Sequence, residues 1–207
     1  MNIRTQAWYP VVFMFLITAV PSALLIGFSR FTSARVRANE QFAFEQAVLK
    51  AVDPATPDNL RGIRLHERFE QTINTDTNAA AGAYRLMTNG QVTAYALPFA
   101  GRGFWQKISG VIGIKPDLTT VTGFYIYQQS ETPGLGAEIT QPWFRKNFVG
   151  LKMAAGDTPI VFARAGKASG PNEVEAVTGG TQTSVRLEKF LNARIVAWRA
   201  AMEEQRR

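Results

Sequence analysis

The residues best suited to chemistry lie near the C-terminal end, where residues 175–184 read EAVTGGTQTS. Two glycines separate two threonines, the second of which is Thr181, and a segment with helical periodicity follows directly. One interpretation is an ordinary helix start, because threonine is a common N-cap and glycine is a common loop residue. The other is an attachment point for a phosphate, since the unpaired N–H groups and the positive dipole end of a helix stabilise a phosphate in its first turn.

Under the second interpretation each residue of the stretch has a physical task. Gly179 and Gly180 let the backbone approach a ligand without clashes from a Cβ atom. Hydroxyl groups nearby can donate hydrogen bonds to the phosphate, and these belong to Thr178, Thr183 and Ser184.

Two further glycine-bearing loops occur earlier in the chain. Residues 131–136 read ETPGLG directly after the most strand-like segment, and the Pro-Gly pair allows a tight turn that exposes backbone N–H groups. Such a loop either cradles a ligand or only turns a corner. Residues 101–105 read GRGFW, and Trp105 could stack on a planar ligand, although filling the core is the more usual role for a tryptophan.

Composition excludes several classes of site. The chain has no cysteine, which removes thiolate-held zinc and iron–sulfur sites, thiol catalysis and disulfides, and we expect no metal site. Its single histidine, His66, lies in a helix-like stretch without a nucleophile elbow, so we assign no catalytic residue. The net charge of +7 is spread along the chain without a basic block, which argues against nucleic acid as a partner.

An apolar segment near the N-terminus is long enough to cross a bilayer. Residues 7–28 carry no charge and would form a helix with aromatic residues at one end, so we expect a retained transmembrane anchor rather than a cleaved signal. The arginines after it, Arg30, Arg35 and Arg37, make anionic membrane lipid a partner. They outnumber Arg4 on the other side, and this count favours a cytoplasmic domain.

The elements that would position these motifs follow from periodicity. Residues 34–52 have helical spacing, residues 53–62 indicate a loop, and Asn89-Gly90 indicates a hairpin turn between two strands. We therefore expect an α+β fold with a mainly antiparallel sheet flanked by helices, divided into an anchor (1–30), a helical stalk and loop (31–60) and one domain (61–207). Further strands are expected at residues 108–114, 119–129 and 158–164, a short helix at 143–152, and a final helix from Thr181 that buries Leu187, Leu191, Ile195 and Trp198.

In this order, the anchor, ETPGLG and TGGTQTS resemble the FMN-binding domain of the NqrC subunit of sodium-pumping quinone reductases and the RnfG subunit of Rnf electron-transport complexes. The family's signature is an acid, two residues, Ser or Thr, Gly, a small residue and Thr. The resemblance implies FMN bound covalently, as a phosphoester on Thr181. Two positions depart from the usual pattern: Glu175 replaces Asp, and Gly180 replaces Ala. By the same resemblance the flavin ring or its ribityl chain would be lined by Glu131, Thr132, Leu135 and Gly136.

The resemblance implies an electron-transfer subunit of an ion-translocating complex rather than a stand-alone enzyme. The short chain favours an RnfG-like subunit; the alternatives are an NqrC-like subunit and a membrane-anchored scaffold module of the same fold without a cofactor. Its partners would be the other subunits of such a complex and a flavin transferase. Its implied location is the bacterial inner membrane with a periplasmic domain, against the arginine count.

Overall fold

The computed structural model describes residues 8–57 and 59–205, so Arg4 and Ala7 of the expected anchor lie outside the described residues. The chain forms two compact units that divide between Gln41 and Phe42. Helix α1 (Trp8–Val52) runs through both units, so the expected anchor and stalk belong to one continuous helix. The second compact unit begins earlier than residue 61 because the last turns of α1 pack against the sheet. The functional division into anchor, stalk and domain stays a prediction.

In the first unit, α1 is an apolar helix with exposed side chains. It is the one helix among the described residues that is long and apolar enough to cross a membrane. The hydroxyl of Thr18 donates to the backbone carbonyl of Met14 at 2.9 Å, and that of Ser22 donates to the carbonyl of Thr18 at 2.7 Å. These bonds satisfy the polar groups within the helix itself, as a hydrocarbon environment requires. Pro21 lies inside the helix without ending it.

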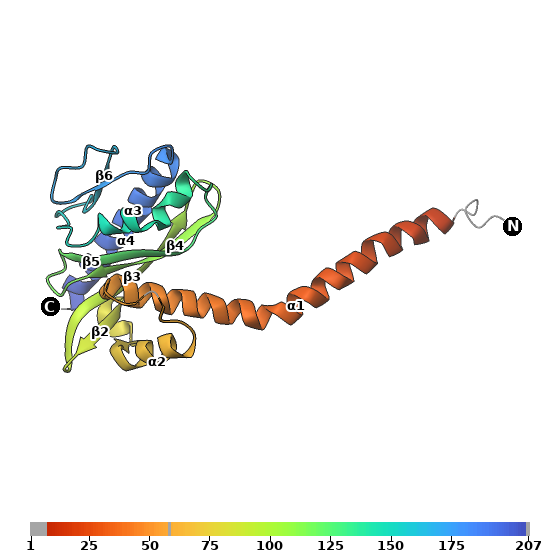
Figure 1. The fold of residues 1–207 in the computed structure, drawn as a ribbon, viewed down its shortest axis with the longest axis horizontal. Helices are drawn as coiled ribbons and strands as arrows, with labels where there is room; N and C mark the ends of the chain where they lie inside the picture. The colour runs from red at the N-terminus through yellow and green to blue at the C-terminus, as the bar shows by residue number, and fades with distance from the viewer. Residues whose placement is uncertain (1–7, 58, 206–207) are drawn as a thin grey trace. The chain divides into compact units, whose positions relative to one another are not determined.

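The second unit is built on a five-stranded antiparallel sheet whose strands are adjacent in sequence order (Figure 1). The strands are β1 (Ile73–Asn74), β2 (Tyr84–Thr88), β3 (Gln91–Arg102), β4 (Lys107–Ile114) and β5 (Val121–Gln128). The remaining elements are α2 (Ile63–Thr72), η2 (Asn78–Ala80), η3 (Gly136–Thr140), α3 (Pro142–Lys146), β6 (Val161–Ala163), β7 (Glu173–Glu175) and α4 (Thr181–Gln205). The α+β fold with a mainly antiparallel sheet and flanking helices is thus confirmed.

The hairpin between β2 and β3 has the predicted turn. Asn89 and Gly90 both adopt positive φ, at 52° and 78°, and Thr88 pairs with Gln91 across the turn. Two positive φ angles define the tight turn that matches the twist of neighbouring strands, which is why Asn-Gly marks it.

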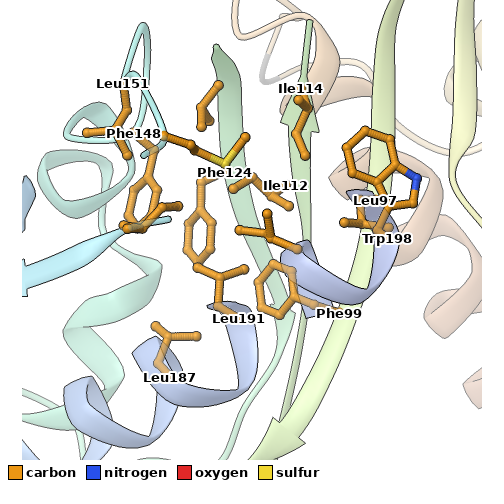
Figure 2. Close-up of a cluster of buried hydrophobic side chains, with 14 of the residues drawn as sticks. Leu97, Phe99, Ile112, Ile114, Phe124, Phe148, Leu151, Leu187, Leu191 and Trp198 are labelled. Carbon is orange, nitrogen blue, oxygen red and sulfur yellow. The ribbon is translucent and has the colours of Figure 1, made fainter. Parts of the chain in front are cut away.

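One face of the sheet packs against α4. The predicted buried positions of this helix, among them Leu191 and Trp198, are fully buried against strand residues such as Leu97 and Ile112 (Figure 2). The indole N–H of Trp198 donates to the carbonyl of Ala80 at 2.9 Å, so the largest buried side chain is also satisfied. This packing holds α4 against the sheet.

The opposite face is covered by the end of α1 and by α2. Ala94, Ala96 and Val111 belong to the buried cluster on this side, which also includes Val48 of α1 and Leu65 of α2. Alternation along β3 sends the neighbouring residues to the α4 face, as the period of two in a strand requires.

Two predicted elements differ from the structure. The helix expected over residues 143–152 is α3, and it ends at Lys146 because the chain then turns through Gly150 at a φ of 81° to pair with β5. The strand expected over residues 158–164 is shortened to β6, which pairs in parallel with β7. No local pattern predicts this parallel pair, because a loop separates the two strands in the chain.

Candidate functional site

Three segments far apart in the sequence meet at a cleft of about 340 Å³. They are the loop between β3 and β4, the loop after β5 that contains ETPGLG, and the first turn of α4. The lining residues are Phe104, Trp105, Glu131, Thr132, Leu135, Gly136, Gly179, Gly180, Thr181, Gln182 and Thr183. The structure therefore brings together eight of the ten predicted cofactor-binding residues, all but Thr178 and Ser184.

Thr181 is the first residue of α4 and its side chain is exposed. The chain enters the helix through Gly179, whose φ of 75° favours glycine. The amide of Ser184 donates to the carbonyl of Gly180 at 2.9 Å, which closes the first helical turn. The N–H groups ahead of Ser184 then have no carbonyl within the helix to bind. A phosphoryl group on the Thr181 oxygen would meet these amides.

Glu131 holds the three segments together. Its carboxylate accepts a hydrogen bond from the Thr183 hydroxyl at 2.5 Å and another from the Trp105 backbone amide at 3.1 Å. Glu131 is 5% exposed and Thr183 is 3% exposed, so the hydrogen bond between them is shielded from water. The indole N–H of Trp105 also donates to the Thr132 hydroxyl at 3.0 Å. Glu131, which the resemblance places beside the flavin, therefore connects the loops that form the cleft.

Two glycines permit the close approach of the ETPGLG loop to α4. A Cβ on Gly136 would overlap the Thr183 hydroxyl oxygen and lie 3.0 Å from the Glu131 Cβ. A Cβ on Gly180 would lie 2.9 Å from a methyl carbon of Val177 and 3.3 Å from the Gly136 Cα. The smallness of both residues is therefore needed for packing, independently of any ligand.

The other two predicted residues lie outside this cleft. Thr178 is exposed and, with Ser184, lines a second cleft of about 570 Å³ that shares Gly179 and Thr181 with the first. Ser184 is 1% exposed, and its hydroxyl accepts a hydrogen bond from the Val177 amide at 3.1 Å. The expectation that both hydroxyls donate to a phosphate meets two obstacles: the Thr183 hydroxyl already donates to Glu131, and Ser184 is buried outside the cleft.

Glu175, which takes the place of the usual aspartate, lines neither cleft. It is the last residue of β7, and its carboxylate accepts a hydrogen bond from the Gly166 amide at 3.2 Å. In this structure the acid therefore closes the loop that follows β6.

The aromatic residues of the β3–β4 loop line the cleft but were not among the predicted site residues. Phe104 and Trp105 are 44% and 61% exposed, so Trp105 does not fill the core as its residue type suggested. Their rings stand edge to face with centroids 5.0 Å apart. Arg186 of α4 steadies this loop by donating to the Gly103 carbonyl at 3.3 Å. A pair of aromatics directly after Gly103 was the available signal.

The residues present fit FMN, the group that the resemblance implies. The cleft volume lies in the range of about 300–1,000 Å³ that is usual for ligand pockets. It offers an exposed hydroxyl, helix N-terminal amides for a phosphate, and the apolar surfaces of Phe104, Trp105 and Leu135 for a planar ring. The residues that the structure describes contain no group of three His, Asp or Glu side chains that could hold a metal ion.

Similar proteins point to the same ligand. Residues 103–195 match the FMN-binding domain family. The chain is 33% identical over 129 residues to the NqrC protein of the Na⁺-translocating NADH-quinone reductase of Pasteurella multocida, covering 61% of this chain and 46% of that protein. It is 37% identical over 145 residues to the corresponding protein of Haemophilus ducreyi, covering 69% of this chain and 52% of that protein.

Two crystal structures share the fold. That of Shewanella oneidensis NqrC superposes with a TM-score of 0.68 at 18% identity, covering 83% of this chain and 99% of that one. That of the corresponding protein from Parabacteroides distasonis gives a TM-score of 0.65 at 23% identity, covering 84% and 96%.

These similarities confirm the resemblance to the FMN-binding domain and correct one expectation. The chain spans about half the length of the curated relatives it matches. Those relatives are NqrC proteins of Na⁺-translocating reductases, so the RnfG-like assignment is not confirmed and the NqrC-like alternative fits better. Chain length misled the sequence-based choice because a chain can match part of a longer relative.

Proposed function

We propose that this chain is an NqrC-like electron-transfer subunit with FMN esterified to Thr181. The premise is the match of residues 103–195 to the FMN-binding domain family. The observation that carries the proposal is the position of Thr181. Its side chain is exposed at the start of a 25-residue helix and lies on a cleft walled by aromatic and glycine-bearing loops. The site needs no further substrate pocket, because a redox subunit passes electrons to neighbouring centres.

Bound flavin supplies reversible electron transfer, and the protein supplies attachment, orientation and electrostatics. Thr181 would supply the ester oxygen, and the first-turn amides of α4 would stabilise the negative charge of the phosphate. The rings of Phe104 and Trp105 would flank the isoalloxazine and exclude water from one side. Leu135 would provide an apolar contact from the ETPGLG loop.

The partners and the location follow from the same proposal. The chain would assemble with other membrane subunits of a Na⁺-translocating NADH-quinone reductase, and a flavin transferase would load it. Helix α1 would anchor it once through the bacterial inner membrane, in contact with lipid, with the second unit in the periplasm. Alkaline phosphatase fused at the C-terminus would be active for a periplasmic domain and inactive for the cytoplasmic domain that the arginine count favours.

The decisive measurement is the mass of the intact protein after co-expression with a flavin transferase. We expect one FMN less one water above the mass of the chain, and fluorescence of the denatured protein band under ultraviolet light. Thr181→Ala should abolish both signals. Ser169→Ala removes an exposed hydroxyl that lines neither cleft and lies outside the signature, so it should retain them. Circular dichroism should show both variants folded.

Two outcomes would contradict the proposal. Flavin that stays covalently bound in Thr181→Ala would place the ester on another hydroxyl. Wild-type protein without flavin mass, absorbance or fluorescence would favour the scaffold module that holds no cofactor.

A further inference from the structure

Arg186 is the charged member of a row of α4 side chains that packs against the entrance to the β3–β4 loop. Thr183, Arg186 and Phe190 stand at positions i, i+3 and i+7 of the helix, so they face the same side. A Cβ on Gly101 would overlap the Phe190 ring, which places this side of α4 directly against the end of β3. The Arg186 side chain is half-buried there, between the helix and the loop.

The Arg186 guanidinium contacts the loop in two ways. Its Nη1–H donates to the Gly103 carbonyl at 3.3 Å. Its central carbon lies 5.9 Å from the centroid of the Phe104 ring, within the range of a cation–π contact. A guanidinium is planar and carries its donors in a fixed arrangement, so it can serve a carbonyl and a ring at the same time.

Phe104 is thereby held from both sides. The peptide before it is fixed by the bond from Arg186 to Gly103, and the peptide after it is fixed by the bond from the Trp105 amide to Glu131. The Phe104 ring itself lines the flavin cleft and stands edge to face with the Trp105 ring. Arg186 therefore helps to determine where the aromatic wall of the cleft lies, although it does not line the cleft.

Arg186 also brings a permanent positive charge to this wall. The cleft contains the buried carboxylate of Glu131, whose charge opposes the addition of negative charge to a ligand. Reduction of a flavin by two electrons and one proton leaves its ring with one more negative charge. A cation held behind the wall offsets the effect of Glu131 and favours the reduced flavin.

We propose that Arg186 is a positioning residue for the flavin, which holds the aromatic wall in place and raises the midpoint potential through its charge. The inference rests on the proposed function, because it concerns flavin attached at Thr181. It assigns control of the potential to a side chain of α4 that touches the flavin only through Gly103 and Phe104.

The first test is the midpoint potential of the full chain loaded by co-expression with a flavin transferase. In a redox titration with mediator dyes, Arg186→Gln should lower the ratio of reduced to oxidised flavin at a fixed solution potential by about threefold or more. Arg186→Lys keeps the charge and should restore most of this ratio. Lys189→Gln removes the same charge from an exposed position of α4 and should match the wild type. Arg186→Met, of similar length without charge, replaces Arg186→Gln if that variant fails to fold.

The second test reports the position of the wall. Aromatic rings in contact with a flavin quench its fluorescence, so Arg186→Gln should emit more strongly per flavin than the wild type. Without flavin, trypsin should cleave after the exposed residue Arg102 severalfold faster in Arg186→Gln, because the loop beside it opens more often. Mass spectrometry of the fragments measures this rate.

The outcomes separate this inference from the proposed function. Wild-type protein that carries no flavin would contradict both. Flavin-loaded Arg186→Gln with the midpoint potential and fluorescence of the wild type would overturn this inference alone. An equal fall in potential in Lys189→Gln would also overturn it, because any positive charge on α4 would then have the same effect.

Discussion

At the scale of single residues, the cleft depends on the carboxylate of Glu131, which acts through hydrogen bonds within the protein. Glu131 accepts from Thr183 and from the Trp105 amide, and so connects the ETPGLG loop both to α4 and to the aromatic loop. A hydrogen bond to a charged group is stronger than a neutral one, and burial increases its weight.

Replacing Glu131 with alanine should therefore destabilise the protein. The change leaves the Thr183 hydroxyl and the Trp105 amide without their acceptor, and each unsatisfied buried group costs about 1–3 kcal/mol. Urea unfolding measures the loss in unfolding free energy. Glu204→Ala, at an exposed position of α4, is the matched control and should change stability little. Equal effects of the two changes would show that Glu131 does not hold the cleft.

Two glycines of the ETPGLG loop should respond differently to alanine. Gly136→Ala introduces a Cβ that overlaps the buried Thr183 hydroxyl, so we expect the loop to move from α4 and flavin attachment to fall severalfold. Gly134→Ala has open space but must adopt a φ of 73°, which costs only about 1–2 kcal/mol. The ratio of flavin absorbance to protein absorbance in the two purified variants measures the difference. Full flavin loading of Gly136→Ala would contradict the close approach.

At the scale of elements, α1 and α2 are joined by an interaction that depends on pH. His66 of α2 lies 2.9 Å from the carboxylate of Glu45, a buried residue of α1, and 3.6 Å from that of Glu70. The hydrogen bond with Glu45 is the main cause that raises the pKa of His66 above its ordinary value of 6.5, and the charges of Glu45, Glu70 and Glu67 add to it.

A raised pKa in the folded state means that protonated His66 stabilises the fold. This contribution is fully present below about pH 6.5 and is lost as the pH rises through the higher pKa of the folded protein. We expect His66→Gln to flatten that decline, as measured by unfolding free energies from about pH 5.5 to 8.5. A variant with the same slope as the wild type would show that another group causes it.

At the scale of the whole molecule, the second unit has a core on both faces of its sheet. Leu187 and Ile195 belong to the core on one face, and Val48 and Leu65 belong to the core on the other. A unit with its own core is expected to fold alone.

Residues 42–207 expressed without the first unit should therefore fold in water without detergent. We expect one cooperative urea transition and the circular dichroism of a mixed α and β protein. A piece beginning at residue 61 is the informative comparison, because it lacks the turns of α1 that cover one sheet face. It should be markedly less stable, and equal stability of the two pieces would mean that those turns contribute little.

The amino-acid sequence by itself determined the features that depend on neighbouring residues. Asn89-Gly90 predicted its hairpin because both residues tolerate positive φ, and the spacing from Leu187 to Trp198 predicted the buried face of α4. The order of ETPGLG and TGGTQTS predicted the flavin-binding domain through its resemblance to a known family, and the family match at residues 103–195 confirms that resemblance.

Only the tertiary structure decided how distant residues use their side chains. In the fold the Thr183 hydroxyl donates to Glu131, 52 positions away, and Ser184 is buried and accepts from the Val177 amide. Trp105 is exposed, and β6 pairs with β7 in parallel. The fold also places Arg186 of α4 beside Gly103 and Phe104. The physical reason is that periodicity and turn chemistry act over a few residues, whereas these contacts follow from the packing of both faces of one sheet.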